Sequence, residues 1–180
     1  MKRRIMLDMD GVLVDFDEQV KRYNARKENG KCDWKMLDKI GPQFWSSMKW
    51  LEEGRKLYDA LLELVKKNPD LELGIASAIF LHNGKNGKRD WLAANCPEIQ
   101  TKNIEIANKG IDKWRCLKES DILIDDVMDN VDLHVKGHPD SRGIVFTDAE
   151  SALRRLDMIL SDDREFDKMC EEHDRTLENS

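Results

Sequence analysis

The sequence contains no long hydrophobic run and no closely spaced pair of cysteines. Its first apolar stretch, Ile5-Met6-Leu7, ends at Asp8. A membrane span needs roughly 20 apolar residues, so we expect no signal peptide and no membrane partner. The absence of a C-x-x-C motif argues against a structural zinc site and favours reduced thiols and a cytoplasmic location. The four cysteines are Cys32, Cys96, Cys116 and Cys170.

Positive charge is also in short supply. The 180 residues include 30 Lys and Arg against 36 Asp and Glu, which gives a formal net charge of −6. Such a chain is not expected to bind nucleic acid or anionic membranes, and a phosphate-bearing small molecule would need local positive charge or a metal ion. Hydrophobic residues make up 40% and charged residues 37% of the chain, which is typical of one globular domain with room for a small insertion.

Five short apolar runs alternate with helical patterns along the chain. Each run is mostly apolar, as expected of parallel strands that are buried on both faces. The clearest helix follows Glu52-Glu53, whose charges suit a first turn, and ends at Asn68-Pro69. The pattern therefore predicts an α/β fold with a three-layer, Rossmann-like parallel sheet. The runs are residues 4–8, 71–78, 104–106, 121–126 and 143–146.

Residues 17–50 fit this alternation poorly. They begin with a charged helical pattern over 17–29 and continue with aromatic residues and Gly/Pro punctuation. We interpret them as a small helical cap inserted after the first strand. Residues 1–16 and 51–160 would then form the core, and the charged residues 161–180 would form a C-terminal helix or tail.

Other segments between the apolar runs carry weaker signals. The polar residues 82–90 predict a loop, followed by a helix that starts at Asp90, and residues 111–118 predict a further helix. Thr147 with Glu150 three residues later has the pattern of a capping box, which predicts a helix that begins there.

Reactive polar residues follow three of the runs. Asp8 and Asp10 come after the first, Ser77 lies near the end of the second, and Asp125 and Asp126 end the fourth. Because ligands bind at the carboxyl ends of parallel strands, we expect these side chains to gather at one edge of the sheet. Four crowded carboxylates need a cation, and Mg²⁺ prefers oxygen ligands. The predicted metal ligands are Asp8, Asp10, Asp125 and Asp126.

This arrangement suits the transfer of a phosphoryl group. Asp8 would attack phosphorus and form an aspartyl-phosphate. Asp10 would protonate the leaving oxygen and later activate water. Ser77 would donate a hydrogen bond to a phosphate oxygen, and a lysine would balance the remaining charge. Gly11 would let the backbone turn sharply beside the ligand.

The same residues carry a resemblance to a known family. The opening DMDGVLVDF resembles the first motif, DxDGxxxD, of the haloacid dehalogenase-like (HAD) superfamily of phosphatases. Ser77 in GIASA is similar to its second motif, and Asp125-Asp126 in ILIDD is similar to its fourth. The order and spacing agree over residues 1 to about 150. The resemblance implies a HAD-type core and a Mg²⁺-dependent phosphatase.

Within that superfamily the sequence resembles the 5′(3′)-deoxyribonucleotidases. These have a short helical cap after the first motif and a paired aromatic before the next helix, where this chain has Phe44-Trp45. The resemblance implies removal of phosphate from (deoxy)nucleoside monophosphates, with both aromatics packing on the base. The chain departs from that family at ASA, residues 76–78, where the family has Thr-Ser-Pro, and at VMD, residues 127–129, where it has Arg-Pro-Asp.

The resemblance also suggests which lysines face the phosphate. Lys113 lies twelve residues before Asp125, in the position of the third motif. Lys88, three residues before Trp91, is similar to a second phosphate-facing lysine of the nucleotidases. Lys109 is a rival to Lys113, about one helical turn earlier. We rank Lys113 first, Lys88 second and Lys109 third.

Three other functions compete with a nucleotidase. A HAD phosphatase for another small ester, such as a sugar phosphate, would differ only in the cap. A signalling receiver domain also uses acidic residues, Ser/Thr and Lys, but its acidic pair comes first, whereas here the pair Asp125-Asp126 follows Ser77. A catalytically silent phosphate-binding module would keep the fold alone, and the full set of carboxylates disfavours it.

Overall fold

A computed structural model describes residues 2–79 and 81–178 of the chain. Within these ranges it describes all side chains except those of residues 82, 164 and 166–178. Cys170 therefore lies outside the described side chains. Among the described residues, no helix is both long enough and apolar enough to cross a membrane.

The centre of the molecule is one five-stranded sheet in which every strand runs parallel to its neighbours. The order is β3-β2-β1-β4-β5, and each strand ends within one residue of its prediction. The middle strand is buried from Arg4 to Leu7, and Arg3 at its start is half-buried. The strands are β1 Arg3–Leu7, β2 Leu71–Ala78, β3 Ile104–Ala107, β4 Ile122–Asp125 and β5 Arg142–Val145.

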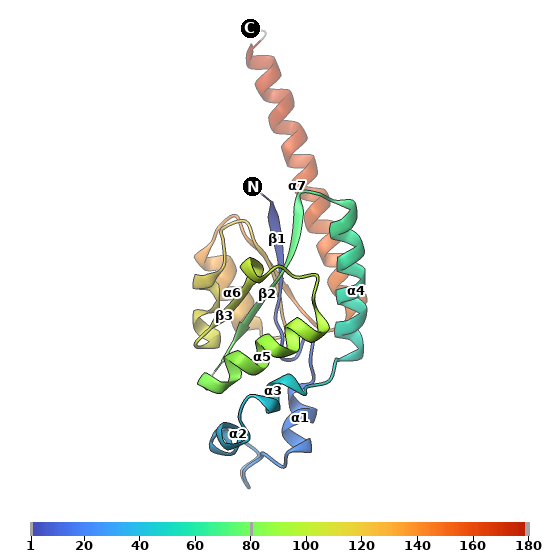
Figure 1. Cartoon of the computed structure of the whole chain (residues 1–180). Coiled ribbons are helices and arrows are strands. Elements are labelled where there is room, and N and C mark those ends of the chain that lie inside the picture. The colour runs from blue at the N-terminus through green and yellow to red at the C-terminus, as the bar shows by residue number, and fades with distance from the viewer. Residues whose placement is uncertain (1, 80, 179–180) are drawn as a thin grey trace.

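Helices cover both faces of the sheet, so the predicted three-layer α/β fold is confirmed. Helix α4, Glu52–Lys67, packs beside α7, Ala149–Glu178, on one side of the strands, and α6, Met128–Gly137, lies on the other (Figure 1). The 3₁₀ helix η2, Gly110–Cys116, packs against α6. The α4 boundaries agree with the prediction, whereas the helix predicted over 111–118 is a shorter 3₁₀ segment.

Three short helices stand at the carboxyl end of the strands. They are α1 Phe16–Arg22, α2 Trp34–Ile40 and α3 Gln43–Ser46, and they form a layer below the sheet in the view of Figure 1. The helix predicted over 17–29 is too long, because Asn24 adopts a φ of 51° that ends regular helix. The division into a core and a cap of residues 17–50 stays a prediction.

The polar segment 82–90, predicted as a loop, is helical. Helix α5 spans His82–Asn95 and packs against α3. Gly84 and Gly87 lie at this contact, and a Cβ on Gly87 would overlap the backbone oxygen of Pro42. Glycine is a poor helix former, so close packing against α3, which only glycine permits, outweighs the local preference.

Helix α7 begins with a different cap from the predicted Thr147/Glu150 box. The side chain of Asp148 accepts the backbone N–H of Ser151 at 2.8 Å, and Thr147 instead donates to Asp148. The helix continues beyond the amino ends of the strands (Figure 1). Asp163 of α7 pairs with Arg3 on β1 and with Arg142 on β5, which connects this helix to the sheet.

Candidate functional site

The predicted site lies where the direction of strand order changes. β1 lies between β2 and β4, so the chain moves outward on one side of β1 and later on the other. Asp8 follows β1, and its backbone N–H donates to the carbonyl of Ile124 on β4 at 2.9 Å. Asp125 ends β4. A crevice at such a switch point is the usual ligand site of an open α/β sheet.

Three of the four predicted metal ligands come together at this point. One carboxylate oxygen each from Asp8, Asp125 and Asp126 lies within 4.8 Å of the other two. Gly11, with a φ of 77°, leaves room for this cluster, because a Cβ on it would overlap the carboxylate of Asp126. The glycine is therefore required both by the backbone turn and by the space that Asp126 occupies.

The cluster carries an electrostatic cost when no cation is present. Asp126 is exposed as a whole residue, but the surrounding protein partly desolvates its carboxylate, and this effect, followed by the charges of Asp8 and Asp125, raises the pKa of Asp126 to about 6. Burial and the charge of Asp8 also raise the pKa of Asp125. Like charges that share a site disfavour each other's ionised form. Three converging carboxylates are the oxygen donor set that Mg²⁺ prefers, so the residues present fit this ion.

Lys113 partly balances these charges. Its ammonium lies 2.9 Å from Asp8 Oδ2 and donates to Asp125 Oδ2 at 2.6 Å, and its side chain is almost completely buried. Burial acts to lower the pKa of Lys113, but the two carboxylates outweigh it and raise the pKa. The two partners use two of the three N–H groups of the ammonium, which leaves one to meet a phosphate oxygen.

Lys88 reaches the same site from α5 but contacts different residues. Its ammonium donates to Asp10 Oδ2 at 2.6 Å, to Ser77 Oγ at 2.8 Å and to the carbonyl of Ala78 at 2.9 Å. The carboxylate of Asp10, predicted as a metal ligand, therefore binds Lys88 and lies outside the cluster of three carboxylates found among the described residues. Lys109, the third-ranked lysine, is exposed and directly precedes η2.

Asn130 contributes to the site although sequence reasoning missed it. Its amide donates to both oxygens of Asp125, at 3.0 and 3.2 Å. The backbone N–H of Val127 also donates to Asp125 Oδ1 at 2.9 Å. These bonds fix the orientation of Asp125. The only signal in the sequence would have been the position of Asn130, five residues after Asp125 and in the first turn of the next helix.

A cavity of about 380 Å³ opens beside Asp8, Asp10 and Lys113. Its volume falls in the range of small-molecule sites. Trp45, one of the two aromatics predicted to pack on a base, lines it, whereas Phe44 is fully buried, packs edge-on against Trp45 and is not among the lining residues. The remaining apolar lining includes Phe16, Trp34 and Ile79, of which the two aromatics were not singled out from the sequence.

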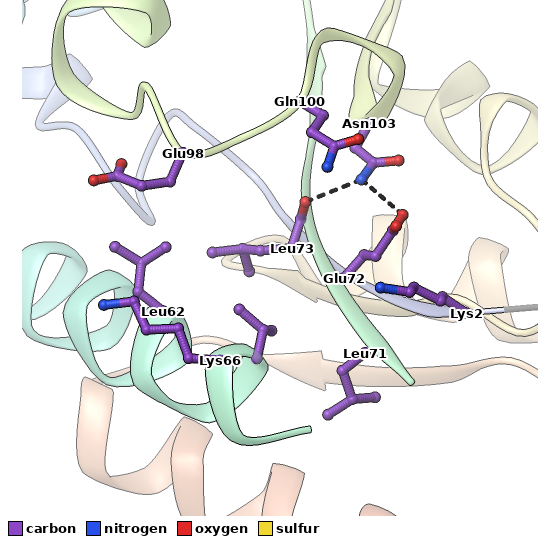
Figure 2. Close-up of a pocket in the computed structure, with 10 residues that line it drawn as sticks. Lys2, Leu62, Lys66, Leu71, Glu72, Leu73, Glu98, Gln100 and Asn103 are labelled. Carbon is purple, nitrogen blue, oxygen red and sulfur yellow. Dashed lines mark hydrogen bonds between the residues drawn. The ribbon is translucent and has the colours of Figure 1, made fainter. Parts of the chain in front are cut away.

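A second hollow, of about 260 Å³, lies near the amino end of β2 (Figure 2). Inside it the amide of Asn103 donates to Glu72 at 3.0 Å and to the carbonyl of Leu73 at 3.4 Å. None of the predicted site residues lines this hollow. The candidate chemistry is therefore concentrated at the carboxyl end of the sheet.

Comparison with known proteins agrees with this architecture. No family model matches the chain, and no curated protein matches it. A hydrolase from Pseudomonas syringae aligns over 88% of this chain and 98% of its own, with 15% identity and a TM-score of 0.50. The HAD domain of the effector Lem4 from Legionella pneumophila aligns over 89% of this chain and 94% of its own, with 13% identity and a TM-score of 0.47.

At these identities the likeness concerns the fold and says nothing of the reaction. What this chain shares with the Pseudomonas hydrolase is therefore the overall arrangement of helices and strands. The likeness to the Pseudomonas hydrolase supports the predicted three-layer α/β fold, and the assignment to the HAD superfamily stays a prediction from the sequence motifs.

Proposed function

We propose that the protein is a Mg²⁺-dependent phosphomonoesterase that acts through an aspartyl-phosphate. The observation that carries this proposal is the meeting of Asp8, Asp125 and Asp126 with the buried Lys113 at the mouth of a cavity with an apolar lining. Carboxylates that a metal and a lysine hold in this way suit in-line attack on phosphorus. Asp8, Asp125 and Asp126 would hold the ion, which would neutralise charge on the phosphoryl oxygens.

In the first step a carboxylate oxygen of Asp8 forms a bond to phosphorus. The bond between phosphorus and the ester oxygen breaks, and its electron pair stays on that oxygen. Asp10 gives this oxygen a proton, so the leaving group departs as a neutral alcohol. Ser77 and Lys113 supply hydrogen bonds to the non-bridging oxygens of the phosphoryl group.

In the second step water attacks the phosphorus of the aspartyl-phosphate. Asp10, now ionised, takes a proton from this water as the new bond forms. The bond from phosphorus to Asp8 breaks, which returns the Asp8 carboxylate and releases inorganic phosphate. Asp10 has then regained its proton, so the cycle closes without another reactant.

We propose nucleoside monophosphates as the substrate class, as the resemblance to the deoxyribonucleotidases implies. Trp45 and Trp34 line the cavity beside the acidic residues, and aromatic rings pack well against a flat base. A phosphatase for a sugar phosphate remains the alternative. It would prefer hydroxyl-rich ligands, for which the apolar lining offers few hydrogen-bond partners.

Phosphate release with and without Mg²⁺ tests the proposal, over a panel of deoxynucleoside monophosphates, sugar phosphates and p-nitrophenyl phosphate. The Asp8→Asn variant is expected to lose at least about 10⁴-fold in kcat, because an amide is not a nucleophile toward phosphorus. Circular dichroism should show an unchanged fold. Asp129→Asn, an exposed residue on α6, is the matched control. Full activity in Asp8→Asn would overturn the assignment of the nucleophile.

A further inference from the structure

Lys88 is a buried charge that the proposed mechanism does not use. Its side chain belongs to α5, yet it is 0% exposed and ends among the site residues. A lysine ammonium has three N–H donors and no acceptor. All three donors have protein partners within 2.9 Å: Asp10, Ser77 and the carbonyl of Ala78. No N–H of Lys88 is left for a phosphate oxygen, whereas Lys113 keeps one.

The contact with Asp10 decides which oxygen of that carboxyl group can carry a proton. Lys88 donates to Oδ2 at 2.6 Å, so Oδ2 has to act as an acceptor. A proton on Asp10 must therefore sit on Oδ1. Oδ1 is buried and has no hydrogen-bond partner among the described residues, although Asp10 lines the catalytic cavity. A buried acceptor without a hydrogen-bond partner destabilises the folded state, so such a group is expected to find its partner in a bound substrate.

The contact with Ser77 has a similar consequence. Ser77 Oγ accepts a hydrogen bond from Lys88 at 2.8 Å, which occupies one lone pair and leaves the hydroxyl hydrogen free to be donated elsewhere. A hydroxyl held in this way presents its O–H as a donor, as a phosphate oxygen requires. One lysine thus orients the proton donor and a phosphate-binding hydroxyl together.

The surroundings of α5 hold Lys88 firmly in this position. Three residues after Lys88, the indole N–H of Trp91 donates to the carbonyl of Met48 at 2.8 Å. One residue before Lys88, Gly87 packs against the backbone of Pro42. A group whose own rotamer is locked by packing is the kind of support that a precise site needs.

We propose that Lys88 is a positioning residue for proton transfer, which fixes the transferable proton on Asp10 Oδ1 and turns the Ser77 hydroxyl toward the phosphate. This inference rests on the proposed phosphatase function. It differs from the role of a phosphate-binding lysine in one measurable way. Removing Lys88 should harm the departure of leaving groups that need a proton, and it should have little effect on leaving groups that do not.

The test compares two substrates in the wild type and in Lys88→Met. One is p-nitrophenyl phosphate, whose phenolate departs without a proton. The other is the alkyl phosphate that the wild type hydrolyses best. A positioned general acid contributes about 10²- to 10⁴-fold, so kcat for the alkyl phosphate should fall at least about 100-fold. The kcat for p-nitrophenyl phosphate should fall by less than about 10-fold, and KM should stay within about 3-fold for both.

Two further variants make the result decisive. Lys88→Gln keeps two N–H donors and should show the same selectivity with a smaller loss, and it provides the test if Lys88→Met does not fold by circular dichroism. Arg89→Gln removes a positive charge from the adjacent, exposed position of α5 and should behave like the wild type on both substrates.

Equal losses on both substrates would overturn the inference. Equal losses with a raised KM would make Lys88 a phosphate-binding residue, and equal losses with an unchanged KM would give it a structural role only. A wild type that hydrolyses no phosphate ester would refute the proposed function itself, and the inference with it. An active wild type with unselective variants would refute the inference alone.

Discussion

At the amino end of the sheet, Arg4 and Asp121 form a buried ion pair in which each charged group has a hydrogen-bond partner. The guanidinium donates to both oxygens of Asp121, at 3.0 and 2.5 Å, and the backbone N–H of Lys118 donates to the same carboxylate at 2.7 Å. At the carboxyl end of the same strands, four acidic residues meet two lysines. These residues are Asp8, Asp10, Asp125, Asp126, Lys88 and Lys113.

The difference indicates which buried charges serve the fold and which await a ligand. A buried ion pair with complete hydrogen bonding keeps its neighbours in register and leaves nothing for a ligand. An excess of carboxylates weakens the folded state, as the raised pKa values of Asp10, Asp125 and Asp126 indicate, and an arrangement of this kind is typical of functional sites. Charge balance, rather than burial alone, separates the two ends.

Breaking the balanced pair should have the largest effect on stability. Arg4→Met leaves Asp121 buried without its partner, which should lower the free energy of unfolding by about 3–5 kcal/mol. Urea denaturation measures this change. The matched control is Arg3→Met, because Arg3 is partly exposed and pairs with Asp163 at the surface. Its loss should stay below about 1 kcal/mol.

The same variant sharpens the comparison through its activity. The folded fraction of Arg4→Met should keep the kcat of the wild type, because Arg4 contacts Asp121 and Glu105 and does not line the cavity beside Asp8 and Lys113. If Arg4→Met and Arg3→Met lost the same stability, the distinction between the two ends of the sheet would not hold.

The unbalanced end should respond in the opposite direction. Without metal, Asp126→Asn relieves repulsion from Asp8 and Asp125, and we expect the free energy of unfolding to rise by about 1 kcal/mol once solvent screening of this exposed residue is considered. A thermal melt in the presence of a chelator would show an increase of about 2–4 °C. The control Asp129→Asn removes an acidic residue from the first turn of α6 and should be neutral or slightly destabilising.

Addition of Mg²⁺ should reverse the order of stability between the wild type and Asp126→Asn. An ion that binds only the folded state stabilises it in proportion to its affinity. The wild type should therefore gain more from Mg²⁺ than Asp126→Asn, which has lost one candidate ligand. A lower melting temperature for Asp126→Asn in chelator would contradict the proposed repulsion.

The strands and the strand-end residues could be predicted because their signals are local. Short, mostly apolar runs predicted all five strands to within one residue, and the position of Asp8, Ser77 and Asp125 at their ends followed from parallel topology. Helix α5 could not be predicted in the same way. Its first half contains two glycines, and packing against α3 decides its conformation.

The details of the site depend on that helix and on the cap. Lys88 belongs to helix α5, which begins at His82. This helix places the lysine side chain within hydrogen-bond distance of Asp10. Phe44 and Trp45 are neighbours in sequence, yet one is buried behind the cavity and the other lines it. Adjacent side chains on a helix point in different directions, and three-dimensional packing decides which of them faces the ligand.

One buried residue near the Arg4–Asp121 pair, His134, has a ring nitrogen without a hydrogen-bond partner among the described residues. Its substitution should have the smallest effect on stability. His134 is fully buried, its Nε2 lies 3.1 Å from the carbonyl of Asp121, and its Nδ1 has no partner among the described residues. The carbonyl requires an N–H on Nε2, so Nδ1 lacks a hydrogen in the neutral ring. Burial lowers the pKa of His134, and the nearby ring of His138 acts in the same direction.

Because the pKa of His134 is lower in the folded state, this residue binds a proton at a higher pH in the unfolded chain than in the folded one. The stability that neutral His134 contributes is complete above pH 6.5 and is lost as the pH falls below this value, with a slope of at most about 1.4 kcal/mol per pH unit. In His134→Gln the amide keeps a donor for Asp121 and removes this dependence. The difference in unfolding free energy between wild type and variant should therefore shrink from pH 7 to pH 5.

Asp126, at the carboxyl end of the sheet, changes the pH dependence of the unfolding free energy in the opposite direction. The raised pKa of Asp126 means that the folded state gains stability as the pH falls through about 6, so the wild-type profile alone mixes both ends of the sheet. Subtracting the His134→Gln profile isolates the histidine, and His138→Gln, which changes a less buried ring, controls for the loss of a histidine. A difference that stays constant with pH would mean that His134 carries no proton-linked cost, and that the amino end is balanced without exception.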